Sequence, residues 1–105
     1  MDCIFCKIVN KEIPANIVYE DDNYLAFDDI NPKMKTHILI IPKKHIDRFD
    51  SISSVEDLEL VKWLLSIADK IVKEKKLNGC RLQINCWKDH GQEVFHIHLH
   101  LMSNS

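Results

Sequence analysis

The apolar positions along the chain follow two periods, one typical of helices and one typical of strands. A short repeat over residues 3–11 predicts a two-turn helix that ends before Pro14. Its inward-facing residues would be Ile4, Phe5 and Ile8. Five further segments have the alternation or the β-branched composition of strands: 16–21, 23–30, 36–42, 80–87 and 94–102.

One long helix is expected to begin after residue 53. Either Ser53 with Glu56 or Ser54 with Asp57 can form its capping pair, and Asn78-Gly79 supplies a left-handed stop. The apolar stripe with 3-and-4 spacing consists of Val55, Leu58, Val61, Leu65, Ala68 and Val72. Four more apolar residues form a second face that would pack elsewhere: Leu60, Trp63, Leu64 and Ile67.

The order of these elements predicts the fold class. One short helix, three strands, one long helix and two strands predict an α+β domain with a mostly antiparallel sheet. With 105 residues, 46% of them apolar, and no repeat or linker, the whole chain 1–105 is expected to form one domain.

Charge and composition exclude several classes of partner. The net charge is −2 and the basic residues are scattered, so we expect neither nucleic acid nor an anionic membrane as a partner. The apolar runs are far shorter than the ~20 residues of a membrane span. Near the N-terminus, Asp2 and the lack of a signal-like apolar run predict a cytoplasmic location, with the nucleus not excluded. In that reducing location cysteines are expected to be metal ligands or reduced core residues, and Cys80 and Cys86 are expected to be small buried residues.

Three of the six histidines lie in one short segment, residues 96–103, which reads HIHLHLMS. In a strand, His96, His98 and His100 would share one face about 6–7 Å apart, while Ile97, Leu99 and Leu101 on the other face would enter the core. A solvated face usually carries Lys, Glu, Thr or Ser, so three imidazoles indicate chemistry. The outer pair would be ~13 Å apart, too far to share one ion, although adjacent histidines could do so. The other candidate is nucleophilic catalysis by a neutral imidazole, with phosphorus as a natural target.

Two nearby motifs carry weaker signals. Gly91 and Gln92 precede the histidines, where backbone amides and a side-chain amide could meet an anion or a leaving group. Cys3 and Cys6 form a C-x-x-C pair, which supplies half of a tetrahedral zinc site. Alone, that pair could equally be two core cysteines or a redox pair.

The segment GQEVFHIHLHLM resembles the signature of the histidine triad (HIT) superfamily, in which three histidines alternate with apolar residues. Residues 3–46, which end in PKKHI, are similar to the N-terminal half of its nucleotide-binding branch. The resemblance spans nearly the whole chain. It implies a HIT-like fold: a five-stranded, mostly antiparallel sheet with one long and one short helix. It also implies a homodimer in which two such sheets join.

The resemblance implies roles for individual residues. His98 would attack the α-phosphorus of a nucleotide, His100 would assist beside the phosphate, and Gln92 would contact the leaving group. Asp29 would hold the ribose hydroxyls. The phosphate would be held by Asn85, Gly91, Val94 and the backbone amide of Glu93, because Glu93 stands where many members have a hydroxyl residue. The apolar slot for the purine would consist of Ile4, Phe5, Ile8, Phe27, Ile30 and Leu39. His37 matches a family histidine, as site support or as a buried residue.

The resemblance also supplies partners for the cysteine pair. Members with this pair bind zinc through it, through the histidine of PKKH and through the first triad histidine. The implied zinc ligands are Cys3, Cys6, His45 and His96, a closed structural site. The loop with Trp87 is bulkier than the glycine-rich version in relatives, which bears on the accepted leaving groups.

The implied function is a purine nucleotide-binding hydrolase that cleaves nucleoside 5′-phosphoramidates through a nucleotidyl-histidine. One alternative is a dinucleoside polyphosphate hydrolase. Another is a non-catalytic nucleotide sensor or a zinc-stabilised interaction module. A third is a redox protein that uses Cys3 and Cys6.

Overall fold

The computed structural model describes residues 2–105. Its helices and strands are α1 Ile4–Val9, β1 Ile17–Glu20, β2 Tyr24–Asp28, β3 Thr36–Pro42, α2 Val55–Lys62, α3 Leu64–Glu74, β4 Arg81–Gln83 and β5 Leu99–Ser103, with the short 3-10 helices η1 Phe49–Ser51 and η2 Lys88–His90. This order confirms the predicted α+β fold. No helix within residues 2–105 has both the length and the apolar character needed to cross a bilayer.

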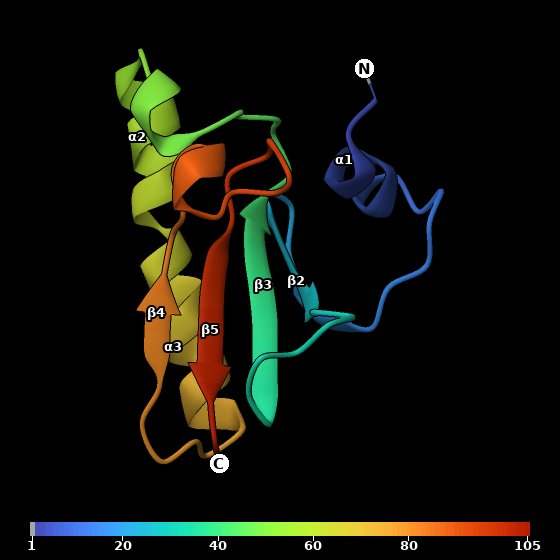
Figure 1. Cartoon of the computed structure of the whole chain (residues 1–105), viewed down its shortest axis with the longest axis vertical. Helices are drawn as coiled ribbons and strands as arrows, with labels where there is room; N and C mark the ends of the chain where they lie inside the picture. The colour runs from blue at the N-terminus through green and yellow to red at the C-terminus, as the bar shows by residue number, and fades with distance from the viewer. Residues whose placement is uncertain (1) are drawn as a thin grey trace.

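The strands form one five-stranded antiparallel sheet in the order β1-β2-β3-β5-β4. The strands β1, β2 and β3 lie side by side in chain order, and β5 lies between β3 and β4. In Figure 1, α2 and α3 run along the sheet behind β4 and β5, whereas α1 lies apart from them, beyond β2. The sheet is therefore covered by different elements on its two faces.

Alternation along the strands divides the interior into two apolar clusters. The first cluster joins Ile38 and Ile40 of β3 to Leu64, Ile67 and Ile71 of α3. Ile97, Leu99 and Leu101 belong to it, which confirms their predicted place in the core. The second cluster joins the opposite sheet face to α1 and consists of Cys3, Phe5, Ile8, Leu25, Phe27, Leu39 and Ile41. The even-numbered triad residues must then face the α1 side.

The helix begins with Ser54 as its N-cap, the second of the two predicted options. The Ser54 hydroxyl accepts a hydrogen bond from the Asp57 amide at 3.1 Å. It is interrupted at Trp63, where α2 ends and α3 begins. There the hydroxyl of Tyr24 donates to the Leu60 carbonyl at 2.6 Å, which supplies a partner for a carbonyl at the end of α2. The helix stops at Glu74, before the predicted Asn78-Gly79.

The predicted apolar stripe is partly wrong. Val61 and Ala68 are buried, but Val55, Leu58 and Leu65 are 78%, 52% and 57% exposed. Leu64 and Ile67, assigned to a second face, pack in the core instead. Both sets have helical spacing, and each is buried only in part, since Trp63 of the second set is itself 52% exposed.

The last two strands are shorter than predicted. β4 covers three exposed residues, and β5 begins only at Leu99, so His96 and His98 precede it. The chain before β5 is still held in place, since the Ile97 amide donates to the Ile46 carbonyl at 2.7 Å. The expectation of buried cysteines here is also wrong, because Cys80 is exposed and Cys86 is only half-buried in the irregular chain beside β4.

Candidate functional site

His98 is a buried histidine whose tautomer follows from its hydrogen bond. Its Nδ1 lies 2.8 Å from the His96 carbonyl, which can only accept, so Nδ1 carries the proton. Nε2 then has a free lone pair. Burial lowers the pKa of His98, which keeps the ring neutral near pH 7. The ring of Phe5 meets it edge-on at 5.2 Å. A neutral, oriented imidazole with an unprotonated Nε2 has the properties of a nucleophile.

His100 lies beside His98, with ring centres 4.9 Å apart, and a chain of hydrogen bonds fixes its tautomer. The Lys33 amide donates to His37 Nδ1 at 3.0 Å, so the proton of a neutral His37 is on Nε2. That Nε2 donates to His100 Nδ1 at 2.9 Å. The proton of His100 is therefore on its own Nε2.

The Nε2–H of His100 has no partner. Among the buried side-chain nitrogen and oxygen atoms of residues 2–105, His100 Nε2 is the one without a hydrogen-bond partner. Burial, followed by the charges of His98 and His37, lowers the pKa of His100 to about 4, so the ring stays neutral. A buried donor without an acceptor is costly unless a ligand completes it. The geometry thus places a donor next to the nucleophile.

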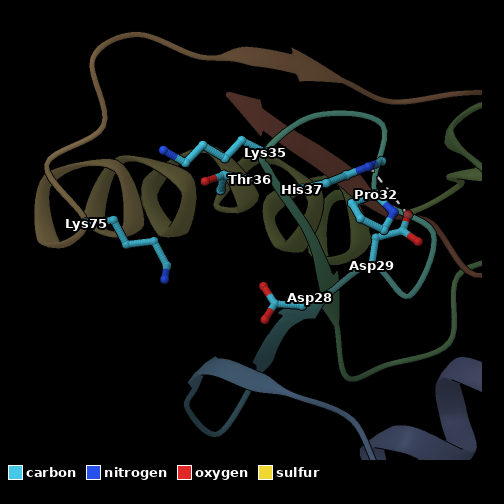
Figure 2. Close-up of a pocket in the computed structure, with 7 residues that line it drawn as sticks. All are labelled: Asp28, Asp29, Pro32, Lys35, Thr36, His37 and Lys75. Atoms are coloured by element: carbon cyan, nitrogen blue, oxygen red, sulfur yellow. Dashed lines mark ion pairs between the residues drawn. The ribbon is translucent and has the colours of Figure 1, made fainter. Parts of the chain in front are cut away.

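Asp29 joins this group from the end of β2. Its Oδ2 lies 3.5 Å from His37 Nε2, and its Oδ1 accepts a hydrogen bond from the Asn31 amide at 2.8 Å. Figure 2 shows Asp29 and His37 side by side at one end of a cavity of about 370 Å³. The remaining lining residues are Asp28, Pro32, Lys35, Thr36 and Lys75. Asp29, His37 and His100 have the spacing of metal ligands. However, the hydrogen bond from His37 Nε2 to His100 Nδ1 occupies the nitrogens that would bind the metal, so we treat the three residues as a hydrogen-bonded group.

Gln92 is 2% exposed, and its amide is hydrogen bonded to the backbone of its own loop and of the loop after β3. Its Oε1 accepts from the Trp87 amide at 2.8 Å, and its Nε2 donates to the carbonyls of Asp47 at 2.8 Å and Val94 at 3.2 Å. All its donors and its acceptor are thus engaged. The expected contact of Gln92 with a leaving group stays a prediction.

The expected phosphate-binding loop is shaped by Gly91. This residue has a left-handed φ of 91°, and a side chain there would come within 3.3 Å of Asn85 Nδ2. That same amide nitrogen approaches the Gly91 carbonyl at 3.5 Å. Val94 is half-buried against the second apolar cluster, whereas Glu93 is exposed.

The residues expected to line the purine slot are only partly assembled. Phe5, Ile8, Phe27 and Leu39 are buried together in the second apolar cluster. The rings of Phe5 and Phe27 meet edge-on at 5.4 Å. Ile4, expected to face inward, is 48% exposed because it lies on the outer face of α1, and Ile30 is 91% exposed in the loop after β2.

Four residues from three segments converge on a second cluster, Cys3, Cys6, His45 and His96, whose ligand atoms lie within 4.8 Å of one another. Cys3 Sγ is 3.5 Å from His96 Nδ1, and Cys6 Sγ is 3.4 Å from His45 Nδ1 and 3.6 Å from His96 Nδ1. Tetrahedral zinc with ordinary Zn–S and Zn–N bonds would separate such atoms by about 3.6 Å.

The hydrogen bonds of the two histidines in this cluster are compatible with metal binding through their Nδ1 atoms. His96 Nε2 donates to the Pro42 carbonyl at 2.7 Å, and His45 Nε2 lies 2.6 Å from an Asp47 oxygen. Both Nδ1 atoms are thereby left to face the sulfurs. Burial and the contact with Cys3 raise the pKa of Cys6 to about 11, so a thiolate here is disfavoured unless a cation lies beside it. The donor set and spacing fit a closed Cys2His2 site.

Comparison with known proteins identifies the family. A sequence model described as "Scavenger mRNA decapping enzyme C-term binding" matches residues 2–105. The chain belongs to the histidine triad (HIT) family. The resemblance carried by residues 91–102 is thus confirmed over nearly the whole chain.

Three relatives illustrate the match. An uncharacterized HIT-like protein of Methanocaldococcus jannaschii is 44% identical over 100 residues, which are 95% of this chain and 77% of that one. A 14 kDa zinc-binding protein of Zea mays is 45% identical, over 94% of this chain and 79% of its own. The crystal structure of a HIT family hydrolase from Legionella pneumophila has a TM-score of 0.93 and 47% identity, and covers 99% of this chain and 94% of its own.

Sequence reasoning left the role of His37 open and did not anticipate Asp47. The strand pattern of 36–42 put His37 on the same face as Leu39, which was the available signal. The pairing of Leu39 with His100 in the β3–β5 register then brings His37 next to His100. Asp47 carried no local signal, since its contacts to Gln92 and His45 depend on how its loop folds.

Proposed function

We propose that this HIT-family chain is a purine nucleotide-binding hydrolase that cleaves nucleoside 5′-phosphoramidates at the P–N bond. The observation that carries the proposal is the pairing of two opposite groups. The ring of His98, which has a free Nε2 lone pair, has its centre 4.9 Å from that of the His100 ring, whose Nε2–H is unpartnered. A nucleophile next to a donor for a phosphoryl oxygen is the minimum that phosphoryl transfer requires.

The reaction would proceed in two steps. His98 Nε2 attacks the phosphorus, the P–N bond breaks, and the departing amine takes up one proton from solvent. A water molecule then attacks the phosphorus of the nucleotidyl-histidine and loses one proton to solvent, the new P–N bond breaks, and the nucleoside monophosphate and neutral His98 are released. His100 would keep its proton and hydrogen bond through Nε2–H to a phosphoryl oxygen in both steps, where negative charge grows.

The nucleotide would be held by groups around this pair. The Asp29 carboxylate has an oxygen free to accept from the ribose diol, because only Oδ1 is taken by the Asn31 amide. The base would lie against the second apolar cluster around Phe5 and Leu39. Asn85 and the backbone amides of the 91–94 turn would hold the phosphate.

The decisive measurement is intact-protein mass spectrometry during turnover of an adenosine 5′-phosphoramidate. The wild type should carry a transient adduct of adenylate mass and release adenosine monophosphate. His98→Ala should form neither the adduct nor the product while it still binds the monophosphate. The control is His90→Ala, an exposed loop histidine, which should behave as the wild type.

The outcomes separate the candidate functions. Binding of the monophosphate by the wild type without adduct or product would favour the nucleotide sensor. Faster cleavage of a dinucleoside polyphosphate than of the phosphoramidate would favour the polyphosphate hydrolase.

We further propose structural zinc at Cys3, Cys6, His45 and His96. Zinc would add four bonds between the start of α1, the loop after β3 and the segment before β5, and a four-ligand site leaves no open position for catalysis. The 3.4–3.6 Å spacing of sulfur and nitrogen atoms supports this, as does the zinc-binding maize relative.

A homodimer is the third part of the proposal. The outer edge of β4 has no neighbouring strand within residues 2–105, and all three of its residues are exposed. Nearby elements also expose large apolar side chains, including Leu65 of α3 at 57%. An unpaired edge beside apolar surface suits pairing with a second copy.

A further inference from the structure

Trp87 has a backbone conformation that is normally found only at glycine. Its φ of 78° and ψ of 155° lie outside the right-handed and left-handed helical regions. A side chain at such angles crowds its own backbone, and the conformation persists only where surrounding contacts hold it. The structure must therefore contain contacts that offset this cost.

The conformation allows the backbone of Trp87 to form two hydrogen bonds with Gln92. The Trp87 amide donates to Gln92 Oε1 at 2.8 Å, and the Gln92 amide donates to the Trp87 carbonyl at 3.1 Å. Val94, two residues further on, packs on the second apolar cluster. That cluster contains Phe5, whose ring meets the ring of His98 at 5.2 Å. Trp87 thus holds one end of the turn, and the cluster beside the proposed nucleophile holds the other.

The side chain of Trp87 is held by a stacked guanidinium. The central carbon of Arg48 lies 4.1 Å from the centre of the Trp87 ring, and the ring of Phe95 lies 5.5 Å away. Arg48 Nη2 donates to Asp50 Oδ2 at 2.7 Å, and its Nε donates to Oδ1 of the same carboxylate. These N–H groups lie in the guanidinium plane, so the face stays free to stack on the ring. Because Trp87 is 37% exposed, burial alone does not fix it.

We propose that the Arg48–Trp87 stack positions the 91–94 turn for the phosphate of the nucleotide. The stack offsets the cost of the glycine-like conformation, and that conformation aims the Trp87 amide at Gln92. It also joins the turn to the loop after β3, where the Asp47 carbonyl accepts from Gln92 Nε2. Arg48 and Trp87 would be positioning residues that do not touch the substrate themselves. This inference rests on the proposed function, which assigns the phosphate to that turn.

Two ligands that differ only in the phosphate test this role. Isothermal titration calorimetry would give the affinities for adenosine 5′-monophosphate and for adenosine, and their ratio isolates the contribution of the turn. Arg48→Met should weaken monophosphate binding by about two- to fivefold, the worth of an exposed cation–π contact, and should leave adenosine binding unchanged. The control is Arg81→Met, which removes the other arginine of the chain and should keep both affinities.

Three more variants separate stacking from charge and from backbone strain. Arg48→Lys keeps the positive charge but not the planar fork, so it should lose monophosphate affinity as Arg48→Met does. Trp87→Ala keeps the steric cost of the backbone conformation and removes the ring. Trp87→Gly removes both, because glycine adopts positive φ freely, and should bind the monophosphate more tightly than Trp87→Ala.

Three results would overturn the inference alone. Equal losses for both ligands in Arg48→Met would indicate a general disturbance of the fold. Full monophosphate affinity in Arg48→Lys would reduce the role of Arg48 to its charge, and equal affinities of the Trp87→Ala and Trp87→Gly variants would exclude the offset of strain. If the wild type binds the monophosphate no more tightly than adenosine, the proposed phosphate site fails, and the inference fails with it.

Discussion

His37 links the backbone to the proposed catalytic pair. Its Nδ1 accepts a hydrogen bond from the Lys33 amide on one side, and its Nε2–H donates one to His100 on the other. An amide N–H can only donate, so the direction of every bond in this chain follows from its first member. The sequence allowed site support or simple burial for His37, and the contacts favour support.

Replacing His37 tests this support. His37→Leu should lower kcat by about tenfold to a hundredfold, because His100 would no longer be held in the tautomer that carries its proton on Nε2. KM for the nucleotide should change much less. His37→Gln can still accept from Lys33 and donate to His100, so it should recover part of the rate. Single-turnover kinetics with a thermal melt would measure both effects.

A wild-type kcat in His37→Leu would contradict the role of His37 in positioning His100. An equal loss in the Leu and Gln variants would point to a general disturbance of the fold.

At the scale of elements, the long helix shows why periodicity alone misplaced a buried face. Its sequence is apolar at two overlapping sets of positions, each with 3-and-4 spacing. The break at Trp63 and the sheet decide which set is buried, so Leu64 and Ile67 enter the core while Leu65 remains exposed. The spacing of apolar residues therefore predicts that the segment is a helix, whereas packing against the sheet decides which of its faces is buried.

Helix α1 has only six residues, too few to be stable by itself. Burial of Phe5 and Ile8 holds it against the sheet. Its N-cap is Cys3, whose Sγ accepts from the Cys6 amide at 3.4 Å, so the proposed metal would bind at the start of this helix.

Removal of the cysteine pair tests that site. Cys3→Ser combined with Cys6→Ser should abolish bound zinc and lower Tm by at least ~5 °C, the effect of losing about 1 kcal/mol in a domain of this size. Catalysis should survive, since His98 and His100 are not ligands. Cys80→Ser with Cys86→Ser, which changes the two other cysteines, should keep zinc and Tm. Elemental analysis and calorimetry give the two readouts.

Zinc content that stays unchanged in Cys3→Ser with Cys6→Ser would exclude the site. An activity difference between reduced and oxidised protein, without zinc, would favour the redox alternative.

At the scale of the whole molecule, the two edges of the sheet offer a matched comparison. Leu82 on the β4 edge and Ile17 on the β1 edge are both 43% exposed. If two sheets join through β4, Leu82→Asp should shift the protein from twice its 12.3 kDa chain mass toward once that mass. Ile17→Asp should leave the mass unchanged. Light scattering measures both variants, and a wild-type monomer would rule out the homodimer.

The sequence by itself determined the order of the elements and the faces of β3 and of the triad segment. Alternation in residues 94–102 put Ile97, Leu99 and Leu101 in the core, and the pattern over 36–42 gave β3 with its observed bounds. These features depend on residues two to four positions apart, so local periodicity suffices to predict them. The triad motif was likewise enough to predict the family.

Only the tertiary structure decided how the side chains are paired. The tautomers of His98 and His100 depend on a carbonyl and on a histidine 63 residues away in sequence. The amide of Gln92, expected to contact a leaving group, is hydrogen bonded to backbone groups of Trp87, Asp47 and Val94. The Cys–His cluster joins residues up to 93 positions apart, such as Cys3 and His96. A hydrogen bond depends on distances of tenths of an ångström and on direction, and those are set when the sheet, helices and loops pack together.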